Sequence, residues 1–332
     1  MEKARREKLS RSQVIAITVI VALFIFAELV LLMIWEKNTG MFPEHDVNSG
    51  TIRYEGVEYV LKENVETFLV LGLDKFEDDS FQDSYNNDKQ ADFIMLFVID
   101  NAEKTYSAIQ INRDSMVNID VLGVAGNKID TVYRQIALSH AYGNGKDLSC
   151  HNTAKSVSLL LLDTKINHYA SLTLDSVAIV NDLVGGVEVC VLDDFSGIDE
   201  NLVMGETVLL KGEQALTYVR ARQGLDDNTN ISRMKRQQQY VKALFYAFDN
   251  SVEMDSQFII DASLKLSECM VSDRSVTQLQ VLVEKFCEYE FLGIRSLEGE
   301  SVVGEEYMEF YPDKNATKKL VVETFYTPKI KK

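Results

Sequence analysis

Proline, cysteine and histidine are scarce in this 332-residue chain, which has only three, four and four of them. The cysteines show no C-x-x-C spacing, which disfavours a structural zinc site. The histidines (His45, His140, His151, His168) are scattered and give no Cys/His nucleophile pair. The sequence also lacks low-complexity linkers and short-period repeats, so it predicts a globular architecture rather than a repeat array.

Positive charge is also in short supply. The chain carries 34 Lys and Arg against 51 Asp and Glu, a formal net charge of −17. Nonspecific binding to nucleic acid needs a basic surface that neutralises phosphates. The composition therefore predicts no nucleic-acid partner.

One long apolar run stands near the N-terminus. Residues 14–35 carry a single charge, Glu28, and about 20 apolar residues suffice for a helix to span a bilayer. Basic residues outnumber acidic ones in 1–13, which places that end in the cytoplasm. A cleaved signal peptide is the alternative, but its apolar region is shorter and ends in small residues. We predict an uncleaved single-pass membrane anchor with residues 36–332 outside the cell.

The outer part is long enough for a sizeable core. We predict a stalk and leading segment at 36–63, a main domain at 64–250, and a completion of the same domain at 251–332. Cys190 lies in an apolar strand-like run and is expected in the core. Cys269 and Cys287 are predicted either to form a disulfide or to remain free thiols.

Short apolar runs alternate with helical patterns over the outer part. Strands are predicted at 67–73, 91–100, 105–111, 168–173, 187–192, 302–310 and 319–326. Helices are predicted at 128–142, 151–162, from 174 to 184, at 212–219, from 233 onward, at 256–266 and at 275–289. This order predicts an α/β fold with a mixed central β-sheet flanked by helices, preceded by the transmembrane helix.

Arginines gather in residues 218–238 of this acidic chain. Arg captures phosphate through planar, bidentate hydrogen bonds, so the segment predicts a phosphate or pyrophosphate site. Arg220 and Arg222 are expected on an extended segment, where side chains two residues apart point the same way.

A helix beginning near Asn230 would place Arg233 and Gln237 on one face, close to an N-terminus that favours anions. A solvated charged face is the alternative for basic residues on a helix, and it is expected for Lys235 and for Arg236.

Seven segments occur in a characteristic order behind the anchor. They are 71–74, 91–92, 112–115, 140–145, 184–188, 212–222 and 233–238. With them the chain resembles the LytR-CpsA-Psr family of cell-wall glycopolymer ligases. The resemblance implies a phosphotransferase that moves a glycopolymer from an undecaprenyl-pyrophosphate carrier to peptidoglycan, with a long apolar tunnel for the lipid.

The resemblance also implies roles for individual residues. The pyrophosphate clamp would consist of Arg113, Arg220, Arg222 and Arg233, with Gln237 as a hydrogen-bond donor. Asp74 and Asp92 would hold Mg²⁺, which suits hard oxygen ligands. Asp114 would either orient Arg113 or accept a proton from the attacking hydroxyl, and the sequence leaves both roles open.

Three positions depart from the family pattern. Gln90 replaces the usual Arg two residues before Asp92, Asn112 replaces a Pro, and Asn230 replaces an acid. A regulatory protein that binds polyprenyl pyrophosphate without turnover, or a hydrolase that cleaves it with water, are therefore kept as alternatives.

Overall fold

The computed structural model describes residues 50–73, 90–143, 146–174, 176–221, 230–254, 258–267, 269–305 and 307–329. Residues 45–123 and 128–332 form one compact unit, to which the following description applies. A second unit comprises 1–44 and 124–127, and only the turn at 124–127 is described. The predicted membrane anchor at 14–35 lies outside the described residues. Within those residues, no helix is long and apolar enough to cross a membrane.

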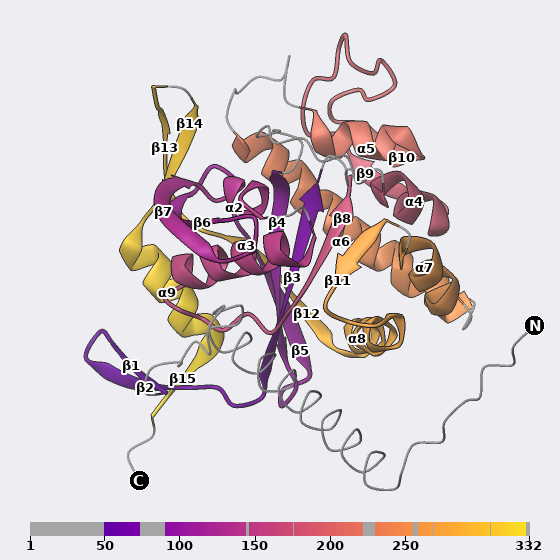
Figure 1. Ribbon diagram of the computed structural model, residues 1–332. Helices are drawn as coiled ribbons and strands as arrows, with labels where there is room; N and C mark the ends of the chain where they lie inside the picture. The colour runs from indigo at the N-terminus through magenta and orange to yellow at the C-terminus, as the bar shows by residue number, and fades with distance from the viewer. Residues whose placement is uncertain are drawn as a thin grey trace, which may run out of the picture. The chain divides into compact units, whose positions relative to one another are not determined.

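A mixed six-stranded sheet forms the centre of the larger unit, with the order β11-β8-β3-β4-β5-β12 (Figure 1). Its strands are β3 (Val65–Leu73), β4 (Ala91–Asp100), β5 (Thr105–Gln110), β8 (His168–Thr173), β11 (Met270–Ser272) and β12 (Glu290–Ser296). β3, β4 and β5 form an antiparallel meander, while β8 and β12 run parallel to their inner neighbours. The predicted strands at 67–73 and 168–173 and the predicted hairpin at 91–111 are confirmed.

Both faces of this sheet are buried, as its long apolar runs require. Leu69 and Leu71 point to one face, where they join a core with α3 (Asp147–Leu160) and α9 (Lys314–Phe325). Phe68, Met95 and Phe97 point to the other face, toward α6 (Asn230–Met254) and α8 (Val276–Glu288). In Figure 1 the two helix sets lie on opposite sides of the sheet.

Smaller elements surround this layer. The remaining strands are β1 (Thr51–Tyr54), β2 (Val57–Leu61), β6 (Met116–Leu122), β7 (Lys128–Gln135), β9 (Val187–Cys190), β10 (Thr207–Leu210), β13 (Gly299–Val303), β14 (Met308–Pro312) and β15 (Tyr326–Pro328). The remaining helices are α2 (Leu138–Ala141), α4 (Ser176–Leu183), α5 (Glu213–Arg220) and α7 (Phe258–Ser267). The predicted strand at 302–310 is divided between the two strands of the β13–β14 hairpin.

The predicted helix at 128–142 is wrong over most of its length. Residues 128–135 form β7, which pairs antiparallel with β6, and only the short α2 follows. The segment is rich in β-branched and aromatic residues such as Ile129, Val132 and Tyr133, which favour a strand once a partner strand is present.

The predicted strand at 319–326 is also wrong, because the segment belongs to helix α9. The Asp313 side chain caps the helix by accepting a hydrogen bond from the Ala316 N–H at 2.7 Å. Leu320, Val321 and Phe325 are then buried against the sheet, so tertiary packing overrides the β-propensity of this run.

The four cysteines all lie in the described residues and are free thiols. Cys269 and Cys287 therefore follow the free-thiol alternative. Cys190 lies in β9 as predicted, but its side chain is exposed and not part of the core. The strand alternates, so its neighbours Val189 and Val191 are the buried residues.

Candidate pyrophosphate site

Arg113 lies in the loop that follows β5, and it meets two carboxylates and an amide. Its guanidinium forms an ion pair with Asp92 at the start of β4 and donates a hydrogen bond to Gln90 Oε1. Its Nε lies 3.5 Å from Asp114 Oδ1. The structure thus brings together Arg113, Asp92 and Asp114, three of the predicted site residues, and adds Gln90 as a direct partner.

Asp114 is held by residues that were not predicted to belong to the site. Its Oδ1 accepts a hydrogen bond from Gln135 Nε2 at 3.0 Å, and its backbone N–H donates to Asn112 Oδ1 at 3.0 Å. Gln135 also donates to the Met308 carbonyl at 2.6 Å. A buried Gln at the end of the otherwise exposed strand β7 has no sequence signal, because its partners are distant in the chain.

Arg233 reaches this cluster from the first turn of α6. Only 3% of the residue is exposed, and its Nη2 lies 3.4 Å from the Asp92 carbonyl oxygen. The start of α6 is tied to the same region by Asn230, whose Nδ2 donates to Asn112 Oδ1 at 2.9 Å. Two arginines from separate elements therefore converge on Asp92.

Arg220 and Arg222 are positioned differently from the expectation. Arg220 is the last residue of α5 and is exposed, so it does not lie on an extended segment. The helix continues to this point because the Ala221 N–H still donates to the Thr217 carbonyl at 3.0 Å. Arg222 lies outside the described residues, and Asp74 does as well.

Arg236 was expected on a solvated face, and this expectation is wrong. It is 1% exposed, and its Nε donates to the Tyr218 carbonyl at 2.8 Å. The guanidinium also contacts Asp193 and the Ala221 carbonyl. Lys235 is exposed, as predicted. Arg233 therefore belongs to the cluster around Asp92, whereas Arg236 makes a structural contact.

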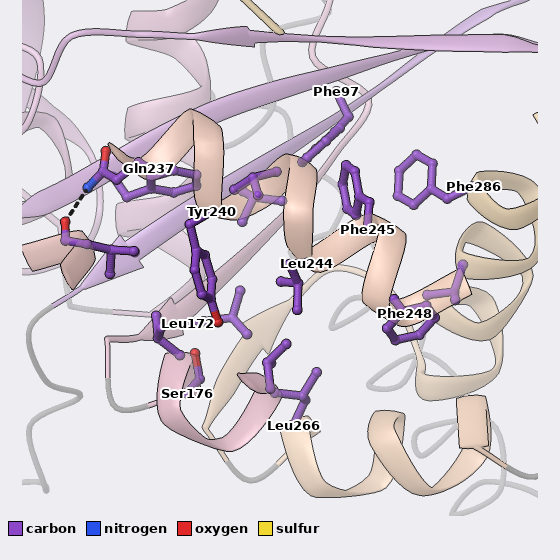
Figure 2. Close-up of a pocket in the computed structure, with 18 of the residues that line it drawn as sticks. Phe97, Leu172, Ser176, Gln237, Tyr240, Leu244, Phe245, Phe248, Leu266 and Phe286 are labelled. Carbon is purple, nitrogen blue, oxygen red and sulfur yellow. Dashed lines mark hydrogen bonds between the residues drawn. The ribbon is translucent and has the colours of Figure 1, made fainter. Parts of the chain in front are cut away.

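Gln237 is also committed to protein partners. It accepts a hydrogen bond from Gln110 Nε2 at 2.9 Å and donates to the Val219 carbonyl at 3.2 Å. Figure 2 shows the second bond and places Gln237 at one end of a cavity along α6. Gln110 was missed by the sequence reasoning, although a Gln within the apolar run of β5 was a visible signal.

The cavity encloses about 340 Å³ between one face of the sheet and helices α4, α6, α7 and α8 (Figure 2). Its wall along α6 repeats at helical spacing. It comprises Gln237, Tyr240, Val241, Leu244, Phe245 and Phe248. Phe248 follows Gln237 by eleven residues, so at about 1.5 Å per residue this wall is about 16 Å long. An apolar cavity with a few polar groups is the usual form of a ligand site.

Two titratable groups that line the cavity, Cys287 and Tyr240, have raised pKa values. Burial and the neighbouring Asp249 carboxylate raise the pKa of the Cys287 thiol to about 11, so this thiol stays protonated at neutral pH. Burial likewise raises the pKa of Tyr240 above its ordinary value of 10. Both side chains are therefore neutral where they face the cavity.

The predicted Mg²⁺ would have Asp92 as a ligand. Mg²⁺ is commonly bound through one or two carboxylates, with water and phosphate oxygens completing the shell. Asp92 would supply one such carboxylate, which in this structure forms an ion pair with Arg113, so a bound Mg²⁺ would have to share it with that guanidinium. Within the described ranges, no group of three or more His, Cys, Asp or Glu side chains could hold a metal ion.

Comparisons with known proteins agree with this architecture. A sequence model of the LytR_cpsA_psr family matches residues 37–311. The chain is 27% identical over 198 residues to the polyisoprenyl-teichoic acid–peptidoglycan teichoic acid transferase TagU of Enterococcus faecalis, covering 58% of each chain. It is 28% identical over 240 residues to the cell wall biosynthesis protein LcpA of Corynebacterium glutamicum, covering 64% of this chain and 45% of that one. The chain thus matches about half of the length of these curated relatives.

Solved structures share the fold at low sequence identity. The structure of TagT bound to LI-WTA has a TM-score of 0.60 and 21% identity, covering 79% of this chain and 90% of that chain. TagV of B. subtilis has a TM-score of 0.56 and 21% identity, covering 81% of this chain and 100% of that one.

Proposed function

Because this chain belongs to the LytR_cpsA_psr family, we propose that it is a membrane-anchored phosphotransferase in cell-wall assembly. In this proposal it moves a glycopolymer from an undecaprenyl-pyrophosphate carrier onto peptidoglycan. The segment 14–35 would anchor it, with the N-terminus in the cytoplasm and the catalytic unit outside. The names of curated relatives, which describe teichoic acid transfer to peptidoglycan and cell-wall biosynthesis, support this assignment.

The observation that carries the proposal is the closeness of two arginines, Arg233 buried and Arg113 partly buried, to an apolar cavity. Arg233 and Gln237 lie one helical turn apart on α6, and Gln237 lines the cavity. Phe93, the neighbour of Asp92, lines it as well. A molecule with a pyrophosphate group next to a polyprenyl chain matches this succession of charge and apolar surface.

Charge stabilisation is the main chemistry that these residues can perform. The acceptor hydroxyl oxygen would form a bond to the phosphorus that carries the sugar. The bond from that phosphorus to the bridging oxygen would break, and polyprenyl phosphate would leave with the electron pair. The proton of the hydroxyl would pass, directly or through water, to the departing phosphate. Arg113 and Arg233 would neutralise the charge that develops on the phosphate oxygens. A bound Mg²⁺, held by Asp92 and Asp74, would add positive charge to the same oxygens.

The contacts of Asp114 favour one of its two predicted roles. Its Oδ1 lies 3.5 Å from Arg113 Nε and accepts a hydrogen bond from Gln135. These contacts fix the carboxylate where it can orient the guanidinium. We therefore assign Asp114 the task of positioning Arg113 for the phosphate.

The test is a transfer reaction with the purified full-length chain in detergent. The reaction would contain polyprenyl-pyrophosphate-linked saccharide, Mg²⁺ and peptidoglycan oligomers, with products identified by mass spectrometry. A phosphosaccharide on the glycan together with polyprenyl phosphate is expected. Sugar phosphate released without linkage would establish a hydrolase instead, and bound but unreacted lipid would establish a binding protein. Chelation with EDTA is expected to lower the rate.

Two matched variant pairs separate the parts of the site. Arg233→Ala should lower turnover by about 100-fold or more, since removal of one charge-stabilising donor costs that much, whereas Lys235→Ala on the exposed side of α6 should not. Leu244→Trp should fill the cavity and weaken lipid binding, whereas Lys242→Ala on the exposed side should not. Unchanged activity in both site variants would refute the assignment.

A further inference from the structure

One side-chain oxygen links the loop after β5 to the start of α6. Asn112 Oδ1 accepts a hydrogen bond from the Asp114 N–H at 3.0 Å and a second from Asn230 Nδ2 at 2.9 Å. Both asparagines are buried, with exposures of 3% and 7%. Buried polar groups need hydrogen-bond partners, so this contact restrains how the loop and the helix lie relative to each other.

Each end of this link carries an arginine of the site. Arg113 follows Asn112 directly, and Arg233 lies one helical turn after Asn230. Both arginines then contact Asp92, one through its carboxylate and the other through its carbonyl oxygen. The Asn–Asn bond and Asp92 thus connect the two arginine-bearing segments at two points.

We propose that Asn112 and Asn230 form a positioning pair that fixes the separation of Arg113 and Arg233 for a pyrophosphate group. This inference rests on the proposed function. The pair is neutral, so it holds the segments together without adding a carboxylate that would compete for the guanidinium groups.

The direction of the hydrogen bond follows from the backbone. The Asp114 N–H can only donate, so the Asn112 atom that faces it must be the oxygen. Asn230 must then present its NH₂ group to the same oxygen. A carboxylate at position 112 could still accept both bonds, whereas a carboxylate at position 230 could not donate one.

This asymmetry gives a matched test with two isosteric variants, Asn112→Asp and Asn230→Asp. Each adds one negative charge, and the altered groups lie 2.9 Å apart, so both charges should weaken anion binding to a similar extent. Only Asn230→Asp removes the donor. We expect the full-length chain with Asn230→Asp to bind inorganic pyrophosphate about tenfold more weakly than with Asn112→Asp, a difference of about 1.4 kcal/mol by titration calorimetry.

A control separates positioning from folding. Asn152 is buried and donates to the carbonyls of Asp120 and Ser139 at 2.9 and 2.8 Å. Asn152→Asp also removes a buried donor, so it should lower the melting temperature without changing the pyrophosphate affinity of the folded protein. The melting temperature of every variant is measured alongside its affinity.

The outcomes distinguish failure of the proposed function from failure of the Asn112–Asn230 pair. Wild-type protein that does not bind pyrophosphate would overturn the proposed function and the pair with it. Wild-type binding with equal affinities in the two Asp variants would overturn the pair alone. If Asn230→Asp unfolds, Asn230→Ala and Asn112→Ala replace the isosteres. If the two residues act as a pair, the affinity of the double variant for pyrophosphate should equal that of the single variant that binds more weakly. A loss of binding free energy equal to the sum of the two single losses would refute the coupling.

Discussion

At the scale of residues, two arginines three positions apart on α6 have different tasks. Arg233 points to the cluster around Asp92, whereas Arg236 joins α6 to the C-terminal end of α5 through the Tyr218 and Ala221 carbonyls. The Arg236 guanidinium also lies over the Phe195 ring, 5.5 Å from its centroid. An Arg that satisfies carbonyls at a helix end replaces partners that the helix itself cannot supply.

We predict that Arg236→Ala destabilises the protein by about 3–5 kcal/mol, because it leaves Asp193 without its buried partner and several carbonyls without a donor. The neighbouring Lys235→Ala should change stability by less than about 0.5 kcal/mol, since Lys235 is exposed. Urea unfolding followed by circular dichroism measures both. Similar stabilities for the two variants would contradict the structural role of Arg236.

The sequence predicted the site residues by type and not by partner. Arg113 and Arg233 both contact Asp92, whereas their predicted roles in binding pyrophosphate and Mg²⁺ stay predictions. Arg236 was misjudged because basic residues on a helix usually form a solvated face. The helix instead packs on two clusters, one containing Tyr240 and the other Val241 and Phe245. The partners of Asn112 could not be predicted, since the Asn230 contact spans 118 positions.

At the scale of elements, a charged cluster joins β3, β8 and α8 around Glu66. Its carboxylate lies 2.9 Å from Lys285 Nζ and 3.8 Å from Arg274. Burial alone would raise the pKa of Glu66, but the hydrogen bond and charge of Lys285, with His168 and Arg274, lower it below the ordinary 4.5. The ionised form is therefore favoured in the folded state, and the cluster holds α8 against the sheet.

This lowered pKa predicts a pH-dependent contribution to stability. It is fully present above the ordinary value of 4.5, and it is lost as the pH falls through the lower folded-state pKa. Glu66→Gln should therefore lower the free energy of unfolding at pH 7, with a smaller loss near pH 3. Glu323→Gln is the control, because Glu323 is half exposed and its ion pairs with Arg295 and Lys319 are 3.4 and 4.0 Å long. A pH-independent difference for Glu66→Gln would disprove the coupling.

Helices and strands were predictable from the sequence where burial requires a clear pattern of apolar residues. The strands at 65–73 and 91–100 are buried on both faces and appear as long apolar runs. By contrast, 128–135 is mostly exposed and depends on pairing with β6, and 319–325 is a helix only because its apolar side is buried. Local pattern cannot report a partner strand or the face that a neighbour covers.

At the scale of the whole molecule, the central sheet is completed from the C-terminal quarter of the chain. Both edge strands, β11 and β12, come from residues 270–296, and α8 covers the face that contains Phe97 and Tyr106. β15 pairs with β2, which joins the two ends of the described chain.

A chain that ends at residue 250 should therefore not form a stable monomer, even though it would contain Arg113 and Arg233. Loss of β11 and β12 exposes the edges of β8 and β5, and unpaired edges promote aggregation. Size-exclusion chromatography and a thermal melt would compare this truncation with the full chain. A monomer with a cooperative melt would contradict the prediction.

The strand order also determines when each part of the central sheet can form during synthesis. The meander of β3, β4 and β5 leaves the ribosome early and can close by local contacts, whereas the two edge strands of the full sheet, β11 and β12, are made after residue 269. At typical rates of synthesis the interval is roughly 10–30 s. During that time the central strands lack the edge strands β11 and β12. The growing polypeptide therefore has to be kept from pairing with other chains until its last quarter has been synthesised.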